Sequence, residues 1–223
     1  MGKITIYKEQ KLQTYEIQEV DTVLQALEEV EQIDPTLEYE SGCKSGVCGC
    51  CSVRVDGRAS LACQKRYEDG MEIAPLDASK EVQDLRVEKG FDKLEGIHLS
   101  SYSDAKVVAS DVAKISLQTD CILCSCCYSA CPVLQTNPAF LGPYALTKVL
   151  RYVDDIKEND KQGFIDRVQK DGVWDCTLCG ECTLVCPQGI DSKVDIMQLR
   201  NKSIQSGYSD PNFQTMDFNL PFN

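Results

Sequence analysis

The sequence has few basic residues and no long apolar run. Its 23 Lys and Arg stand against 35 Asp and Glu, which gives a net charge of −12. A protein that binds nucleic acid needs a basic face for the phosphates, so this composition argues against nucleic acid as a partner. No stretch approaches the about 20 apolar residues that cross a bilayer. We therefore expect contact with a membrane only through partners.

The sequence also lacks the local patterns of a substrate-converting site and of a secreted protein. We find no phosphate-binding loop, activated nucleophile or acid–base pair, so we expect the chain to bind no carbon substrate of its own. The first ten residues, MGKITIYKEQ, have neither the basic start nor the apolar core of a secretory signal. This predicts a cytoplasmic protein, peripheral at the membrane, although export on a partner's twin-arginine signal is compatible with the same sequence.

Cysteine, in contrast, is abundant, with fourteen in 223 residues. The first group is Cys43, Cys48, Cys50, Cys51 and Cys63. The second group is Cys121, Cys124, Cys126, Cys127 and Cys131, and the third is Cys176, Cys179, Cys182 and Cys186. A chain of this size without a secretory signal has no need of so many disulfides. The groups therefore predict metal binding.

The second and third groups share the spacing CxxCxxCxxxCP, which is the ferredoxin signature for a pair of 4Fe-4S clusters. Zinc sites favour paired CxxC knuckles, which is a different pattern. In the two-cluster pattern, the cysteine before the proline ligates the other cluster. We therefore predict one 4Fe-4S site held by Cys121, Cys124, Cys127 and Cys186, and another held by Cys176, Cys179, Cys182 and Cys131.

The first group has the form CxxxxCxxC with a late fourth cysteine, which is the plant-type spacing of a 2Fe-2S cluster. The predicted ligands are Cys43, Cys48, Cys51 and Cys63. Gly42, Gly46 and Gly49 support this, because a chain that wraps closely around a cluster needs residues without a side chain. Cys50 and Cys126 are left over. We interpret both as small buried fillers, with Cys50 also open as an alternative ligand.

Hydrophobic periodicity predicts an α+β protein whose N-terminal domain, residues 1–100, is a 2Fe-2S ferredoxin-type domain of the β-grasp class. The expected strands are residues 3–8, 12–18, 52–55, 59–63 and 71–76. Asp21 is expected to cap a helix that ends at Asp34-Pro35. The face of this helix that should be buried carries Val23, Leu24, Leu27 and Val30. Asp56-Gly57 predicts a two-residue hairpin.

Residues 101–223 are expected to form a helical ferredoxin domain with two 4Fe-4S clusters. Residues 77–115 are charged and mixed, which indicates a connection with short helical pieces. One helix should begin near Pro143, which suits a first turn, and bury one face of Leu146, Val149, Leu150 and Val153. Others should cover about 161–170 and 192–202. The aperiodic tail holds Tyr208, Phe213, Phe218 and Phe222, which predicts either docking to a partner or packing on this chain.

Taken together, these motifs resemble the iron–sulfur subunit of the succinate dehydrogenase and fumarate reductase family over nearly the whole chain. The resemblance is carried by SGCKSGVCGCC followed by Cys63, DCILCSCCYSACP, NPAFLGPYAL and CTLCGECTLVCPQGI. It implies a chain that passes electrons between a flavoprotein subunit, where FAD interconverts succinate and fumarate, and a quinone-reactive or other redox partner. The implied path runs through the 2Fe-2S site, the Cys121 cluster and the Cys131 cluster in line.

Two departures from that family's usual pattern concern the end of this path. The usual member lacks a cysteine at the position of Cys179 and holds a 3Fe-4S cluster, so this chain is expected to hold a second 4Fe-4S cluster. It also has Val133, Leu134 and Gln135 where relatives carry tryptophans, and Thr177 where many carry a histidine. The chain thus resembles the variant branch of methylmenaquinol:fumarate reductases and archaeal-type succinate dehydrogenases. Its expected partner is a cysteine-rich subunit resembling heterodisulfide reductase, and a cubane of lower potential predicts a bias toward fumarate reduction.

Two other functions stay open from the residues alone. The chain could be an iron–sulfur electron-transfer subunit for another flavoprotein oxidoreductase or a heterodisulfide-reductase-like complex, or a binding module in which the clusters are structural. His98 is expected on the surface, since four cysteines per site suffice as ligands. Trp174, two residues before Cys176, is expected to pack over the cluster.

Overall fold

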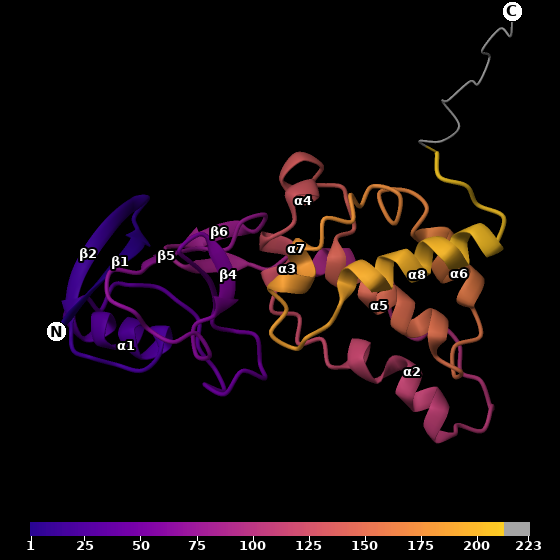
Figure 1. Cartoon of the computed structure of the whole chain (residues 1–223), viewed down its shortest axis with the longest axis horizontal. Coiled ribbons are helices and arrows are strands. Elements are labelled where there is room, and N and C mark those ends of the chain that lie inside the picture. Colours follow the sequence, from indigo (N-terminus) through magenta and orange to yellow (C-terminus); the bar gives the residue numbers. More distant parts are fainter. Residues whose placement is uncertain (212–223) are drawn as a thin grey trace, which may run out of the picture.

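The computed structural model describes residues 1–211 and is elongated, with strands at one end and helices at the other (Figure 1). The indigo and purple residues form a sheet with one helix beneath it, and the orange and yellow residues form the helical part. This mixture confirms the α+β class. We call the two ends the sheet part and the helical part.

The sheet part contains all five strands that the sequence predicts. Its elements are β1 (Gly2–Lys8), β2 (Lys11–Ile17), α1 (Val23–Ile33), β3 (Ser52–Val55), β4 (Arg58–Leu61) and β5 (Glu72–Ala74). The strands form one sheet in the order β2-β1-β5-β3-β4, in which β1 is parallel to β5 and the other neighbours are antiparallel. In β1, Ile4 and Ile6 are fully buried, as strand alternation requires.

Helix α1 buries the face that the sequence predicts, with Val23, Leu24, Leu27 and Val30 all in the core. The predicted cap was wrong by one residue, because Thr22 occupies the N-cap position in place of Asp21. The Thr22 hydroxyl accepts a hydrogen bond from the Gln25 amide at 3.3 Å, and the Gln25 side chain accepts one from the Thr22 amide at 3.1 Å. This capping box satisfies two donors at the helix start. The predicted hairpin is confirmed, with positive φ at Asp56 and Gly57.

The segment after the sheet is more ordered than the sequence predicts. It contains β6 (Lys80–Gln83), β7 (Arg86–Glu88), the 3-10 helix η1 (Phe91–Leu94) and α2 (Ala109–Thr119). The expectation of a connection with only helical pieces was therefore wrong for the β6–β7 hairpin. Asp84 at its turn accepts hydrogen bonds from the amides of Glu9 and Glu38, both at 3.0 Å. The hairpin is thus fixed by distant segments, and its strands are too short for alternation to be recognised.

Helix α5 is the centre of the helical part and packs against α2, α6 and α8. The helices after α2 are α3 (Cys126–Ser129), α4 (Pro132–Thr136), α5 (Pro143–Asp154), α6 (Lys161–Arg167), α7 (Glu181–Leu184) and α8 (Ser192–Gln205). The predicted face of α5 is buried, with Leu146, Val149, Leu150 and Val153 all in the core. Helix α6 ends before the predicted Lys170, because its last turn tightens where the Val168 amide bonds to the Ile165 carbonyl.

Each part has its own hydrophobic core, but the second cysteine group contributes to both. Cys124 and Cys126 lie in the core of the sheet part, whereas Cys131 lies in the core of the helical part. Tyr208 packs on the helical core, and its hydroxyl donates to the Asp166 carboxylate at 2.7 Å. The other aromatic residues of the predicted docking tail lie outside the described residues; they are Phe213, Phe218 and Phe222.

Candidate iron–sulfur centres

The β3–β4 hairpin positions one half of the candidate 2Fe-2S site. Cys51 directly precedes β3 and Cys63 lies two residues after β4, and the Ala62 amide donates to the Cys51 carbonyl at 2.9 Å. Both thiols are buried. Burial raises the pKa of Cys51 to about 12, with a further electrostatic contribution from Cys63 and Cys48. The structure therefore places three of the four predicted ligands close together.

The other half of this site lies on the irregular loop between α1 and β3. The backbone amide of Ser45 donates to Cys43 Sγ at 3.4 Å, and the amide of Cys43 donates to Cys48 Sγ at 3.4 Å. Amide donors from Ser45 and Val47 lower the pKa of Cys43 to about 6. A thiolate is the form that binds metal, so the loop favours ligation. The turn is made at positive φ, 57° at Lys44 and 79° at Gly46.

The first candidate 4Fe-4S site combines two segments that are far apart in sequence. One pocket is lined by all four predicted ligands, which are Cys121, Cys124, Cys127 and Cys186. Cys121 follows α2, Cys127 lies in α3, and Cys186 follows α7. Burial raises the pKa of Cys121 and Cys127, and the neighbouring thiols, Cys186 among them, raise it further. The crossing of Cys186 to the second group is thus present in the fold.

The second candidate 4Fe-4S site has the reciprocal composition. Burial is the first cause of the raised pKa of Cys131, and Cys176 and Cys179 add to it electrostatically. The pKa of Cys182 is raised to about 12 by burial and by the same neighbours together with Cys131. The four predicted ligands are therefore neighbours. Cys182 and Cys131 are buried, whereas Cys179 is exposed.

The loops of the second and third groups share a backbone pattern. Two residues after its first cysteine, each has a leucine at positive φ, 53° at Leu123 and 57° at Leu178. The residue after the second cysteine is also left-handed, with φ of 65° at Ser125 and 88° at Gly180. A short helix then begins in both loops, α3 in one and α7 in the other. The backbone conformation around Cys179 therefore matches that around Cys124.

Backbone amides in both loops point at sulfur. In the second group, burial raises the pKa of Cys121, and a hydrogen bond from the Leu123 amide to Cys121 opposes that rise. The Leu178 amide donates to Cys176 Sγ at 3.3 Å, and the Ile190 amide donates to Cys186 Sγ at 3.4 Å. The ligands of a cubane bind different iron atoms and stand further apart than the ligands of one ion. Among residues 1–211, no three Cys, His, Asp or Glu side chains are placed to hold a single metal ion. The donor sets fit clusters.

The two left-over cysteines differ in their surroundings. Cys126 is fully buried and hydrogen-bonds to Cys124, which raises the pKa of Cys126 strongly. Cys50 is half-buried, and its thiol donates to the Cys48 carbonyl at 3.9 Å. Its pKa is also raised, first by its hydrogen bond to Cys48 and then by burial. The prediction of a buried filler thus holds for Cys126 and only partly for Cys50.

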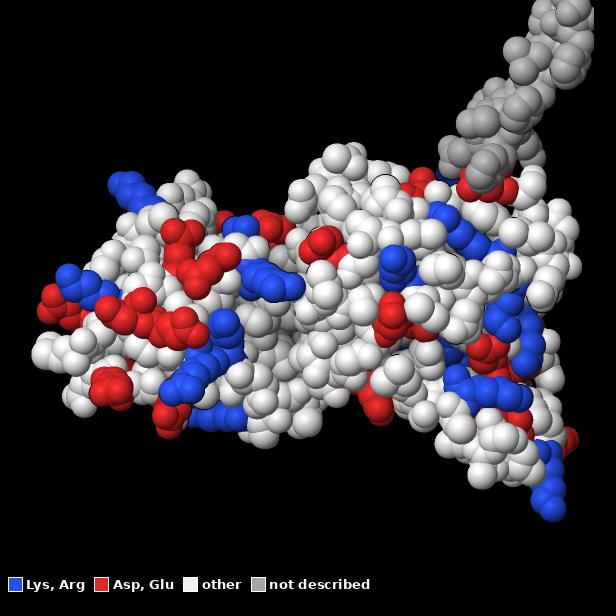
Figure 2. Space-filling model, viewed as in Figure 1, with Lys and Arg blue, Asp and Glu red and all other residues white. Residues whose placement is uncertain are grey.

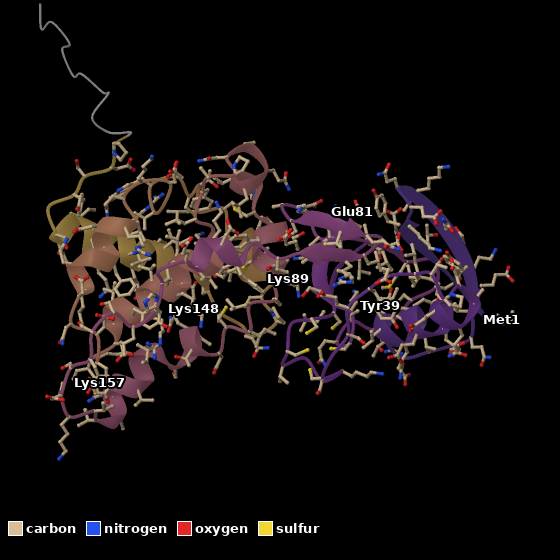
Figure 3. All side chains as sticks on the ribbon, turned by 180° about the vertical axis from the view of Figure 1, so that it is seen from behind. Met1, Tyr39, Glu81, Lys89, Lys148 and Lys157 are labelled. Carbon is tan, nitrogen blue, oxygen red and sulfur yellow. The ribbon has the colours of Figure 1, made fainter. Side chains whose placement is uncertain are left out.

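A lysine that the sequence motifs do not include joins the first two sites. Lys89 lies where the sheet part meets the helical part (Figure 3), and its side chain is 9% exposed. The Lys89 ammonium donates to the carbonyls of Gly49 and Cys50, at 2.6 and 3.2 Å. Hydrogen bonds from Cys126 are the main cause that lowers the pKa of Cys124 to about 7, and Lys89 lowers it further. Only the fold reveals this role of Lys89.

Trp174 and Arg200 support the start of the third group. Trp174 is 8% exposed in the helical core, and its indole donates to Gln169 at 2.9 Å; its packing over the cluster stays a prediction. The Arg200 guanidinium donates to the carbonyls of Val173 and Cys176, at 2.8 and 2.5 Å. His98 is exposed, as predicted.

The outer surface carries acidic and basic side chains that are interspersed on the face in view (Figure 2). Acidic residues crowd the sheet part in this view, and one pocket there is lined by Glu19, Asp21, Glu28, Glu29, Glu68 and Asp69 among others. Within the described part of the chain, no helix combines the length and the apolar character that crossing a membrane requires.

Comparison with known families matches both parts. The family described as "2Fe-2S iron-sulfur cluster binding domain" matches residues 4–91, and the "4Fe-4S dicluster domain" matches residues 118–190. The fumarate reductase iron-sulfur subunit of Escherichia coli O157:H7 is 31% identical over 182 residues, 75% of each chain. The 8-methylmenaquinol:fumarate reductase iron-sulfur subunit of Wolinella succinogenes is 29% identical over 85% of this chain and 66% of its own length.

Two further similarities concern a longer relative and the fold. One subunit of the CoM/CoB fumarate reductase of Methanothermobacter marburgensis is 29% identical over 88% of this chain but only 42% of its own length. A chain of the Mycobacterium smegmatis Sdh1 complex in the apo form has a TM-score of 0.84 at 20% identity, covering 94% of this chain and 98% of that one. The paired ferredoxin domains, their fold and the 31% identity together show that the chain belongs to the family of iron–sulfur subunits of succinate dehydrogenase and fumarate reductase.

Proposed function

We propose that this chain is the electron-transfer subunit of a succinate:quinone or quinol:fumarate oxidoreductase, in which it connects an FAD subunit to a second redox partner. One observation carries this function. The fold forms two four-cysteine sites that each take thiols from both the second and the third cysteine group, and a further cysteine site lies beside them on the sheet part. When bound, iron–sulfur clusters at these sites supply one-electron carriers. No substrate site of the chain's own is needed for this role.

The proposed cofactors are one 2Fe-2S cluster and two 4Fe-4S clusters. The 2Fe-2S ligands are Cys43, Cys48, Cys51 and Cys63. Cys121, Cys124, Cys127 and Cys186 hold one cubane, and Cys176, Cys179, Cys182 and Cys131 hold the other. The assignment of Cys179 is supported by its loop, whose left-handed positions match those around Cys124. The chain's part is to supply thiolates, aim amides at sulfur and exclude water from the buried ligands.

The second partner is proposed to be a cysteine-rich subunit that docks near the third group and makes the complex peripheral at the membrane. Exposed apolar side chains lie on α7 and α8, the two helices that follow Cys179, where Leu184, Val194 and Met197 are 65%, 42% and 44% exposed. Such residues suit an interface. A second cubane of low potential suits a low-potential quinol donor, and this supports a bias toward fumarate reduction.

The experiment is to purify the chain with its flavoprotein partner and combine iron analysis with EPR. We expect about ten irons per chain, no oxidised three-iron signal, and succinate-dependent reduction of a dye by the complex. About nine irons with a three-iron signal would contradict the second cubane. A terminal cluster that titrates well above the menaquinone couple would contradict the bias toward fumarate reduction.

The similarity to the CoM/CoB enzyme favours one alternative, in which the second partner uses a thiol pair in place of a quinone. The same purified complex separates the two. Oxidation of a thiol pair coupled to fumarate reduction would support the alternative, and oxidation of a menaquinol analogue would support the first proposal.

A further inference from the structure

Ser125, in the loop of the second cysteine group, has a buried hydroxyl with no hydrogen-bond partner. The residue is 1% exposed, and among residues 1–211 its Oγ is the one buried side-chain oxygen or nitrogen atom left without a partner. A buried hydroxyl without a partner destabilises a protein, because it loses its hydrogen bonds to water and gains none in return. Native structures keep few such groups, and each needs an explanation.

The backbone at Ser125 adds a second cost. Its φ is 65°, in the left-handed region that disfavours residues with a Cβ atom. The third group has Gly180 at the equivalent position, with a φ of 88°. Glycine would relieve both the backbone strain and the unpaired hydroxyl at position 125. A serine there is unfavourable for the fold of the chain without cofactors.

The surroundings of Ser125 show what could pair with its hydroxyl. Ser125 lines the same pocket as Cys121, Cys124, Cys127 and Cys186. The pocket's other three hydroxyl side chains already have partners. Tyr144 donates to the Gly90 carbonyl, and the Gln188 side chain, also polar, donates to the Gly46 carbonyl at 3.1 Å. Thr147 Oγ1 donates to the Asp195 carboxylate at 2.8 Å and lies 3.2 Å from Ser192 Oγ. The hydroxyl of Ser125 is therefore the polar side chain of this pocket that is left for a bound group.

We propose that the Ser125 hydroxyl donates a hydrogen bond to a sulfur atom of the 4Fe-4S cluster held by Cys121, Cys124, Cys127 and Cys186, and thereby raises its reduction potential. The proposal rests on the cluster assignment of the proposed function. Reduction adds one negative charge to the cluster, so a donor to sulfur stabilises the reduced form more than the oxidised form. The third group has Gly180 at this position and lacks the donor, so the reduction potential of its cluster is not raised in this way.

The test is Ser125→Ala in the purified complex, with the potential of each cluster measured by EPR-monitored redox titration. We expect the equilibrium constant for reducing the first cubane to fall about tenfold, a shift of about 59 mV to lower potential for one electron. The 2Fe-2S cluster and the second cubane should keep their potentials. An unchanged potential of the first cubane in a variant that holds its full iron content would overturn the proposal.

Ser129→Ala is the matched control, because Ser129 is also a buried serine near this loop but its Oγ accepts from the Asp77 amide at 2.9 Å. It should leave the first cubane's potential unchanged. If Ser125→Ala fails to fold, Ser125→Gly removes the hydroxyl and the strained Cβ together and must give the same shift.

Pulsed EPR after exchange into D₂O gives a readout independent of potential. An exchangeable proton coupled to the first cubane should be present in the parent complex and absent in Ser125→Ala. Its persistence in the variant would contradict the assignment of the donor. Absence of any cubane signal in the parent would instead refute the proposed function.

Discussion

The loops of the second and third cysteine groups have matching left-handed positions but different surroundings. Cys124 is 7% exposed and belongs to the core of the sheet part, whereas Cys179 is exposed. A Cβ atom added to Gly49 would lie 3.0 Å from Cys124 Cα, so the 2Fe-2S loop packs directly on the second group. The same loop motif thus forms the buried junction between the two parts in the second cysteine group and a solvent-exposed site in the third.

Replacing Cys124 or Cys179 by alanine should show the largest difference between the two loops. Cys124→Ala takes a ligand from a buried site that both parts share, so we expect loss of the first cubane, about four irons per chain. The unfolding temperature of the complex, followed by circular dichroism, should fall with it. Retention of all irons in Cys124→Ala would show that another thiol, with Cys126 the nearest candidate, replaces it.

Cys179→Ala should have a smaller effect, because Cys179 is exposed and contributes to neither core. We expect the loss of about one iron per chain and the appearance of a three-iron EPR signal in the oxidised protein. The reduction potential of this site should rise, and the rate of fumarate reduction by a low-potential quinol should change while the fold persists. A loss of all four irons would contradict this view of an outward site that tolerates the missing ligand.

The ligand sets stay a prediction, but the sequence indicates which thiols the fold brings near one another, because thiol spacing is a local property. Each predicted set of four cysteines is brought together, even where Cys186 and Cys131 cross between groups. The strands were also predicted, since Ile4 and Ile6 show the alternation of a half-buried strand. The cap of α1 could have been found too, because Thr22 and Gln25 form the spacing of a capping box.

The junction between the two parts could not be predicted in the same way. Lys89 acts through carbonyls of a loop about forty residues earlier, and no local pattern indicates that approach. The β6–β7 hairpin is held by the Asp84 carboxylate, which accepts from Glu9 and Glu38. The unpaired hydroxyl of Ser125 depends on what the fold places around it. These features arise from tertiary packing and have no signature in a single segment.

Alanine in place of Gly49 tests how closely the 2Fe-2S loop packs on the second cysteine group, and alanine in place of Gly180 is the comparison in the third group. Gly49 has a φ of 71°, and its added Cβ would lie 2.9 Å from the Ile122 carbonyl and 3.0 Å from Cys124 Cα. Both are backbone atoms, so we expect Gly49→Ala to lower the free energy of unfolding by about 3 kcal/mol. Gly180→Ala meets only Lys193 Cδ at 3.6 Å and should lower it by about 1 kcal/mol.

Urea denaturation of the complex, followed by circular dichroism, measures both glycine variants. Equal losses at the two positions would show that left-handed strain alone decides the effect and that the contact with the second group is loose. In Gly49→Ala, the electron transfer from the 2Fe-2S cluster to the first cubane should also slow, because the two loops must separate.

The smallest expected effect is the change in cluster reduction potential when Lys89 is replaced. Its ammonium contacts the 2Fe-2S loop and lowers the pKa of Cys124, so a positive charge acts on the first two sites but not on the third group. A cation stabilises the reduced, more negative cluster. Lys89→Met should therefore lower the potentials of the 2Fe-2S cluster and the first cubane by about 30–60 mV each and leave the second cubane unchanged.

Two controls decide whether the charge of Lys89 is the cause. Lys93→Met removes a lysine whose ammonium donates to the Pro138 carbonyl at 2.7 Å, and all three potentials should stay as they are. Glu40→Gln removes the carboxylate 3.8 Å from the Lys89 ammonium and should raise the first two potentials slightly, since that carboxylate offsets part of the charge. If Lys89→Met shifts only the reduction potential of the 2Fe-2S cluster, the charge of Lys89 acts on that cluster alone. The junction between the two parts would then be a packing contact without an electrostatic effect on the first cubane.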